Sequence, residues 1–236
     1  MNGKGVLITG ASKGLGAALA EELSGAGARV VLVARAEEEL RKTVARIRDR
    51  GGEAHALPGD VSDKLQAHRI AGAAAALVGP IELLVHNAST LGPTPLRLLL
   101  DTECEDLEQV LQTNLVGPFR LTKIVAGAMA LRGSGLVLHV SSDTAVAAYP
   151  RWGAYGVSKA ALDHMNRIWA VELAQTGVRF LSVDPGEMDT EMHAAAVPEA
   201  DRGELAQPVR VARWIARLVA HGVESGSRIV VPGEAR

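Results

Sequence analysis

Tyr155 and Lys159 stand four residues apart in a segment whose apolar residues have helical spacing. Residues at this spacing share one face of a helix, so the ammonium group of Lys159 is expected near the phenol of Tyr155. A nearby cation favours the phenolate and lowers a tyrosine pKa from its usual value of about 10. General acid–base catalysis needs a pKa close to the working pH, so the pair predicts a tyrosine that exchanges a proton with a substrate.

Ser142 follows an apolar run of strand type and precedes Tyr155 by thirteen residues. Ligands of α/β sheets bind at the carboxyl ends of strands, so this hydroxyl is expected to hold a substrate oxygen beside the phenol. A tyrosine and a lysine at this spacing also occur by chance, and Ser141 and Ser142 equally suit an ordinary turn. The prediction therefore depends on further motifs.

A glycine-rich segment, residues 9–16 with the sequence TGASKGLG, lies between the first apolar run and a helical segment. Glycines allow a tight turn and let backbone amides approach a pyrophosphate at the positive end of a helix. The spacing differs from the common G-x-G-x-x-G pattern, so a turn that binds nothing is the alternative for this segment alone.

Two cations indicate which dinucleotide would bind. The second apolar run ends at Ala34 and Arg35, where an NAD site usually carries an acidic residue for the ribose 2′-hydroxyl. Arg35 and Lys13 would instead neutralise a 2′-phosphate, so we expect NADP(H) as cofactor. The alternative is that both are solvated surface cations.

Apolar runs rich in β-branched residues alternate with segments of helical spacing along the whole chain. The predicted strands are residues 6–8, 29–33, 53–57, 83–86, 136–140, 178–183 and 228–231, and the predicted helices are residues 15–24, 37–50, 64–77, 105–130, 154–175 and 209–221. This alternation predicts an α/β fold: one Rossmann-type domain over residues 1–236, with a doubly wound parallel sheet of about seven strands and helices on both faces.

Composition and charge exclude several other classes. The formal net charge is -2 and no long basic block is present, so nucleic acid is not an expected partner. No apolar run reaches membrane-spanning length, and the first apolar stretch is too short for a signal sequence. Cys104 is the single cysteine, and no residues show metal-ligand spacing. We expect a cytoplasmic protein without a metal site or a membrane partner.

Several ordered motifs together resemble the short-chain dehydrogenase/reductase family over essentially the whole chain. They are TGASKGLG at 9–16, DV at 60–61, HNAS at 86–89, N at 114, SS at 141–142, YGVSK at 155–159 and PGEMDT at 185–190. The resemblance implies four catalytic residues. Tyr155 would transfer the proton, Ser142 would orient the substrate, Lys159 would bind the nicotinamide ribose and lower the tyrosine pKa, and Asn114 would position a water that links Lys159 to solvent.

The resemblance also implies a cofactor site. Its members would be Gly10, Ser12, Lys13, Gly14, Leu15, Gly16, Arg35, Asp60, Val61, Asn87, Ala88, Tyr155, Lys159, Pro185, Gly186, Met188 and Thr190. Asp60 and Val61 would contact the adenine, Asn87 would lie beside the ribose, and residues 185–190 would hold the nicotinamide carboxamide. His86 and His139 depart from the family pattern, and we interpret both as residues packed within strands.

Substrate contacts are expected from residues 147–153 and from a lid at about residues 187–204. The candidate pocket residues are Ser142, Trp152, Met192 and His193, because apolar and aromatic walls with few polar groups suit small molecules. Little charge near the start of the lid favours a small ketone or aldehyde. Residues 150–155 and 184–192 are also similar to the sepiapterin reductase branch.

The resulting hypothesis is an NADPH-dependent carbonyl reductase or alcohol dehydrogenase. The alternatives are an NAD-linked alcohol dehydrogenase working in the oxidative direction and a non-catalytic NADP-binding sensor. Residues 105–130 and 154–175 resemble the helices through which family members dimerise, so a homodimer or homotetramer is expected.

Overall fold

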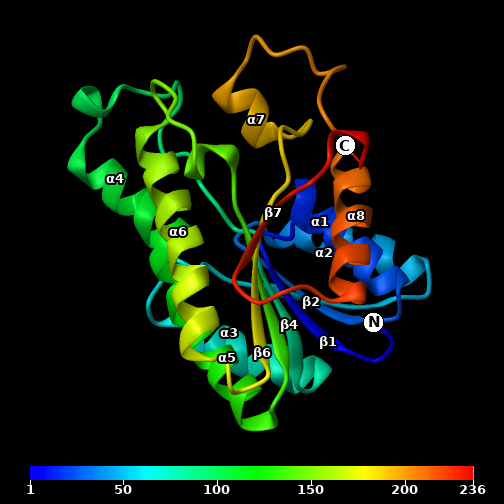
Figure 1. Cartoon of the computed structure of the whole chain (residues 1–236). Coiled ribbons are helices and arrows are strands. Elements are labelled where there is room, and N and C mark those ends of the chain that lie inside the picture. The colour runs from blue at the N-terminus through cyan, green and yellow to red at the C-terminus, as the bar shows by residue number, and fades with distance from the viewer. Residues whose placement is uncertain (236) are drawn as a thin grey trace.

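The computed structural model describes residues 1–235, and its seven strands form one parallel sheet in the order β3-β2-β1-β4-β5-β6-β7 (Figure 1). The strands are β1 (Gly5–Thr9), β2 (Arg29–Ala34), β3 (Glu53–Pro58), β4 (Ile81–His86), β5 (Gly135–Val140), β6 (Val178–Asp184) and β7 (Ser227–Val230). The order reverses between β1 and β4, which is where doubly wound sheets bind their ligands. The predicted sheet is confirmed.

Helices cover both faces of this sheet (Figure 1). They are α1 (Gly14–Gly25), α2 (Glu37–Asp49), α3 (Gln66–Val78), α4 (Cys104–Leu111), α5 (Gly117–Arg132), α6 (Gly153–Glu172), α7 (Glu191–Ala196) and α8 (Pro208–His221). Helices α1, α2 and α8 pack on one face, and α3, α5 and α6 pack on the other. Among residues 1–235, no helix combines the length and apolarity needed to cross a membrane.

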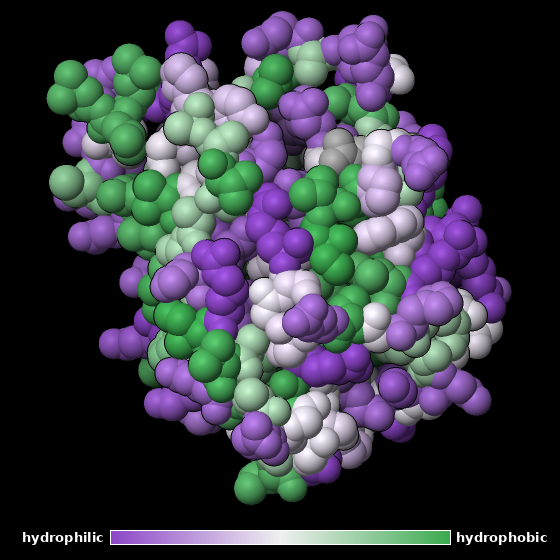
Figure 2. Space-filling view, in the orientation of Figure 1, coloured by the Kyte–Doolittle hydropathy of each residue, from purple (hydrophilic) through white to green (hydrophobic). Residues whose placement is uncertain are grey.

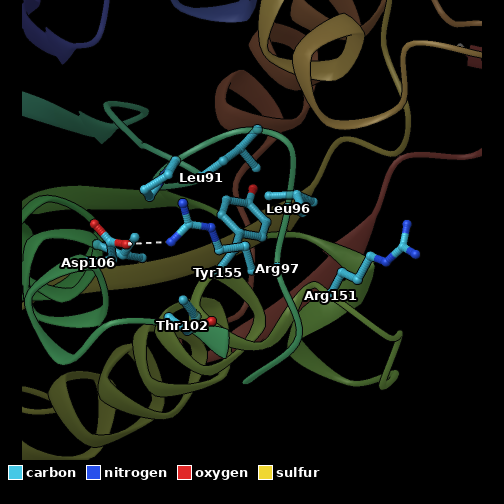
Figure 3. A pocket seen from close by; sticks show the side chains of 11 residues that line it. Leu91, Leu96, Arg97, Thr102, Asp106, Arg151 and Tyr155 are labelled. Carbon is cyan, nitrogen blue, oxygen red and sulfur yellow. Dashed lines mark ion pairs between the residues drawn. The ribbon is translucent and has the colours of Figure 1, made fainter. Parts of the chain in front are cut away.

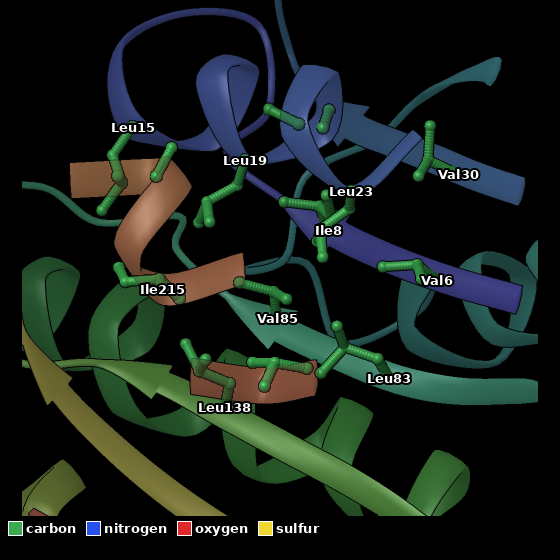
Figure 4. Packing of buried hydrophobic residues seen from close by; sticks show 14 of the residues in the cluster. Val6, Ile8, Leu15, Leu19, Leu23, Val30, Leu83, Val85, Leu138 and Ile215 are labelled. Carbon is green, nitrogen blue, oxygen red and sulfur yellow. The ribbon is translucent and has the colours of Figure 1, made fainter. Parts of the chain in front are cut away.

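The sheet has a separate hydrophobic core on each face, and alternate residues of a strand pack into one core or the other. In β2, Val30 and Leu32 pack toward α1, whereas Val31 and Val33 pack toward the opposite face. A strand covered on both faces is apolar at every position, which explains the continuous apolar runs in the sequence. The first core appears in Figure 4, which shows side chains of α1 and α8 over those of β1, β2, β4 and β5.

The predicted helix over residues 105–130 is helical throughout, but it is not a regular α-helix along its whole length. Helix α4 ends at Leu111, a π-helical turn spans Gln112–Val116, and α5 begins at Gly117. The amide of Gly117 donates to the carbonyl of Gln112, five residues earlier. Pro118 has no amide hydrogen to bond the carbonyl four residues before it, so a regular α-helix is interrupted here. This proline was the signal in the sequence for the interruption.

Two leucines of α5 test which face of the helix stabilises the fold. Leu121 is 2% exposed and Leu131 is 92% exposed. We expect Leu121→Ala to lower the free energy of unfolding by about 2–5 kcal/mol, because it leaves a cavity between α5 and the sheet. The matched change Leu131→Ala is expected to alter it by less than about 0.5 kcal/mol. Urea unfolding of both variants measures this difference, and equal losses would contradict the packing.

Candidate active site

A cleft of about 1050 Å³ opens at the carboxyl edge of the sheet. All of the predicted site residues line this cleft except Gly16 and Asn114. The predicted residues that do line it are Gly10, Ser12, Lys13, Gly14, Leu15, Arg35, Asp60, Val61, Asn87, Ala88, Ser142, Trp152, Tyr155, Lys159, Pro185, Gly186, Met188, Thr190, Met192 and His193. Segments far apart in sequence thus meet in one place because parallel strands all end at this edge.

The glycine-rich segment forms one wall of the cleft. Gly10 has a φ of +64°, and a Cβ there would lie 2.7 Å from the Cα of Ala88. A Cβ on Gly16 would clash with the carbonyl oxygen of Gly10, so Gly16 acts through close packing behind the wall. Lys13 occupies the N-cap of α1 and forms no side-chain capping bond there. The first amides of α1 are therefore free of a capping side chain, as an anion site at a helix N-terminus requires.

Asn87 ties the ends of β1 and β4 together. Its side-chain amide donates to the carbonyl oxygens of Gly10 at 2.8 Å and Thr9 at 3.2 Å. The Thr9 hydroxyl accepts hydrogen bonds from the amides of Asn87 and Ala88, both at 3.2 Å. These bonds hold the wall of the cleft at the point where the strand order reverses.

Both cations predicted to bind a 2′-phosphate line the cleft, and each lies beside a carboxylate. Lys13 forms an ion pair with Glu191 of α7, and its hydrogen bond to that carboxylate lowers the Glu191 pKa. An Arg35 nitrogen lies 4.0 Å from an oxygen of Asp60. The Lys13 and Arg35 side chains are 64% and 78% exposed, so these surface pairs are weak and a multiply charged anion can compete for both cations.

Ser142, Tyr155 and Lys159 lie together at the end of β5 and the start of α6. The Lys159 ammonium group lies 5.4 Å from the centre of the Tyr155 ring and donates to the carbonyl oxygen of Val140 at 2.8 Å. The Ser142 hydroxyl donates to a carboxylate oxygen of Asp143 at 2.9 Å. The cleft thus brings together a phenol, a serine hydroxyl and a buried ammonium group.

Burial controls the protonation of this group. It raises the pKa of Tyr155 above its ordinary value, although the neighbouring Ser89 and Ser142 hydroxyls lower it. The expected net lowering of the tyrosine pKa is thus not found, because desolvation has the largest effect on it. Burial also lowers the pKa of Lys159 to about 8, opposed by the negative charge of Asp163. Ser89, the last residue of the HNAS motif, also lines the cleft and was missed as a site residue.

Asn114 lies in the π-helical turn and is 1% exposed. Its side-chain oxygen accepts from the amide of Thr90 at 2.8 Å, while its side-chain nitrogen donates to the Thr90 carbonyl at 2.9 Å and to the Ser158 hydroxyl at 3.0 Å. The side chain therefore crosslinks the turn to the residue beside Lys159. Pro118 has no amide hydrogen to bond the main-chain carbonyl of Asn114, four residues earlier.

His86 and His139 lie inside the sheet, on adjacent strands and outside the cleft. Their rings stack with centroids 5.0 Å apart. Burial lowers the pKa of His139 to about 4 and also lowers the pKa of His86. Both side chains are therefore neutral near neutral pH, as packing within strands requires.

A smaller hollow of about 20 Å³ adjoins the other side of Tyr155 (Figure 3). Arg97 lies there with a nitrogen 3.9 Å from a carboxylate oxygen of Asp106. Figure 3 shows Arg97 directed at Asp106, whereas Arg151 points away from them. This side of the tyrosine thus carries an ion pair that was not predicted.

Comparison with known proteins identifies the family. A family model described as short chain dehydrogenase matches residues 4–201. The chain is 37% identical over 199 residues to a short chain dehydrogenase of Pseudocercospora fijiensis. That match covers 82% of this chain and 62% of the relative, so this chain spans less than two thirds of that protein's length.

Two solved structures share the fold. Actinorhodin polyketide ketoreductase with NADPH has a TM-score of 0.89 and 29% identity, covering 98% of this chain and 97% of that one. A 7α-hydroxysteroid dehydrogenase with NADH and 7-oxo glycochenodeoxycholic acid has a TM-score of 0.90 and 28% identity, covering 98% and 94%. Since the family model covers most of the chain and these neighbours share its sheet and helices, the chain belongs to the short-chain dehydrogenase/reductase family of oxidoreductases.

Proposed function

We propose that this chain is an NADP(H)-dependent carbonyl reductase or alcohol dehydrogenase acting on a small ketone or aldehyde. One observation carries the proposal: Ser142, Tyr155 and Lys159 converge in the same cleft as the glycine-rich wall. A proton-transfer group beside a dinucleotide-type site is the arrangement that hydride transfer to a carbonyl requires.

A nicotinamide cofactor held in the cleft would supply or accept the hydride. In reduction, Tyr155 gives its phenolic proton to the substrate oxygen, and in oxidation it takes the proton back. Ser142 holds that oxygen through its hydroxyl, which must turn from Asp143 to the substrate. Lys159 places an ammonium group 5.4 Å from the centre of the phenol ring, where a positive charge would favour the phenolate that forms when the proton leaves.

The preference for NADP(H) is supported by charge. The end of β2 presents Ala34 and Arg35, with Lys13 on the same cleft. A 2′-phosphate would be attracted by both cations, although it must displace the carboxylates of Asp60 and Glu191. Solved neighbours hold either NADPH or NADH, so the fold alone leaves both cofactors open.

Residues 187–204 are proposed as the substrate lid. Helix α7 lies within them, and its N-cap Thr190 accepts a hydrogen bond from the amide of His193 at 3.2 Å. The ion pair between Lys13 and Glu191 connects this helix to the glycine-rich wall. Met192 and His193 would then face a substrate across the cleft from Trp152.

Self-association is proposed through α5 and α6. Exposed apolar residues on these helices include Phe119, Val157, Ile168 and Val171. Figure 2 shows apolar surface on this side of the molecule. Covering such a face by a second copy would remove apolar area from water, which favours a homodimer or homotetramer.

Replacing Tyr155 by Phe tests the mechanism. The ring and its packing remain, but the proton donor is lost, so turnover is expected to fall about 10²- to 10⁴-fold. NADPH oxidation against a panel of ketones and aldehydes measures turnover, and NADPH fluorescence measures binding, which should change by less than about threefold. Near-normal turnover would refute Tyr155 as the acid, while an inactive wild-type protein that binds NADPH would favour a non-catalytic sensor.

Arg35→Glu tests the cofactor assignment. Reversing the charge places a carboxylate against a 2′-phosphate, so NADPH affinity should fall at least about tenfold while NADH affinity changes little. Arg41→Glu is the matched control, because Arg41 lies on α2 outside the cleft. Calorimetric titration with both cofactors decides, and an equal loss for NADPH and NADH would contradict the assignment.

Lys159→Met tests the buried charge. The folded-state pKa of about 8 lies below the ordinary 10.5, so the ammonium costs stability below pH 8. That cost disappears as pH rises from about 8 to 10.5, so wild type should gain up to about 3 kcal/mol of unfolding free energy relative to the variant. Urea unfolding at pH 7 and pH 10 measures the change, with the exposed Lys123→Met as control for losing a lysine. If the difference in unfolding free energy between wild type and Lys159→Met did not change with pH, Lys159 would not be a buried cation.

A further inference from the structure

Arg228 on β7 makes three hydrogen bonds beneath the active site. Its Nε donates to a carboxylate oxygen of Asp163 on α6 at 2.9 Å. Its Nη2 donates to a carboxylate oxygen of Asp184 at 3.0 Å and to the carbonyl oxygen of Ser142 at 2.8 Å. The Arg228 side chain is 19% exposed, and those of Asp163 and Asp184 are 5% and 4% exposed. A half-buried guanidinium with these three bonds is held in one orientation.

These bonds connect parts of the site that the sheet alone leaves separate. Strand β7 pairs only with β6 in the sheet order, yet Arg228 reaches past β6 to the end of β5, where Ser142 stands. Asp184 ends β6, and its other carboxylate oxygen accepts from the amide of Gly186 at 2.9 Å. The Arg228 guanidinium thus links Ser142, which is proposed to hold the substrate, to the segment that begins with Pro185 and Gly186 and is expected to hold the cofactor.

The same contacts balance charge in the interior. Asp163 also accepts a hydrogen bond from the Ser141 hydroxyl at 2.8 Å, and it lies one helical turn after Lys159 on α6. Two carboxylates and two cations, Arg228 and Lys159, therefore occupy this buried region. Removing one cation would leave an uncompensated carboxylate among buried groups, which is costly.

We propose that Arg228 is a positioning residue that fixes Ser142 and the Pro185-Gly186 segment relative to each other and to α6. The proposal rests on the proposed function, because its consequence for turnover assumes that Ser142 orients the substrate oxygen. A small displacement of an orienting group reduces the rate more than it reduces substrate binding. Arg228 thereby controls the alignment of substrate and nicotinamide without touching either.

Three variants test this role. Arg228→Met removes charge and hydrogen bonds, Arg228→Lys keeps the charge but loses the planar fork, and Arg179→Met removes an exposed arginine from neighbouring β6 as the matched control. We expect Arg228→Met to lower kcat about 10- to 100-fold with the ketone KM changed less than about threefold. Compared with Arg228→Met, Arg228→Lys should restore the wild-type melting temperature but only part of the wild-type kcat. Arg179→Met should match wild type.

Wild-type values of kcat for Arg228→Met, or full recovery of kcat by Arg228→Lys, would overturn the proposal. If Arg228→Met does not fold, Arg228→Lys decides by the same measurements.

NADP⁺ affinity is the second readout, since loss of the Asp184 anchor should weaken this affinity about tenfold in Arg228→Met and leave it unchanged in Arg179→Met. If wild type reduces no carbonyl, the proposed function fails, and this affinity comparison still decides the role of Arg228: equal affinities would overturn it.

Discussion

Parallel pairing of all seven strands is the constraint on which the rest of the structure depends. It places every strand's carboxyl end at one edge and requires a crossover helix between neighbours, so both faces of the sheet are covered. Because both faces are covered, most positions of the central strands are apolar, and the polar residues that follow the strands are left at the same edge. The reversal of order between β1 and β4 then opens the cleft at this edge.

Polar groups beneath the cleft are tolerated only because they are bonded or neutral. Lys159 donates to the carbonyl of Val140, Arg228 binds two buried carboxylates, and His139 stays neutral because burial lowers its pKa to about 4. Each of these arrangements of polar groups has a physical consequence. The lysine pKa falls toward working pH, and the arginine becomes a rigid link between strand ends.

The π-helical turn shows how a local irregularity can support a site. Asn114 lies within the turn, and its side chain bonds Thr90 and Ser158. Ser158 precedes Lys159 on α6, so the irregularity braces the helix that carries the lysine. Irregular turns of this type are frequent at functional sites because they redirect a side chain without ending the helix.

The sequence by itself determined the strand and helix alternation, the glycine-rich turn and the set Ser142, Tyr155 and Lys159. Each is a local pattern: periodicity, a required φ or a fixed helical spacing. Tertiary structure decided what depends on contacts between distant segments. The pairing of Lys13 with Glu191 and the reach of Arg228 to Ser142 join residues far apart in the chain. The direction of the Tyr155 pKa shift likewise depends on burial, which arises only when the surrounding elements pack together.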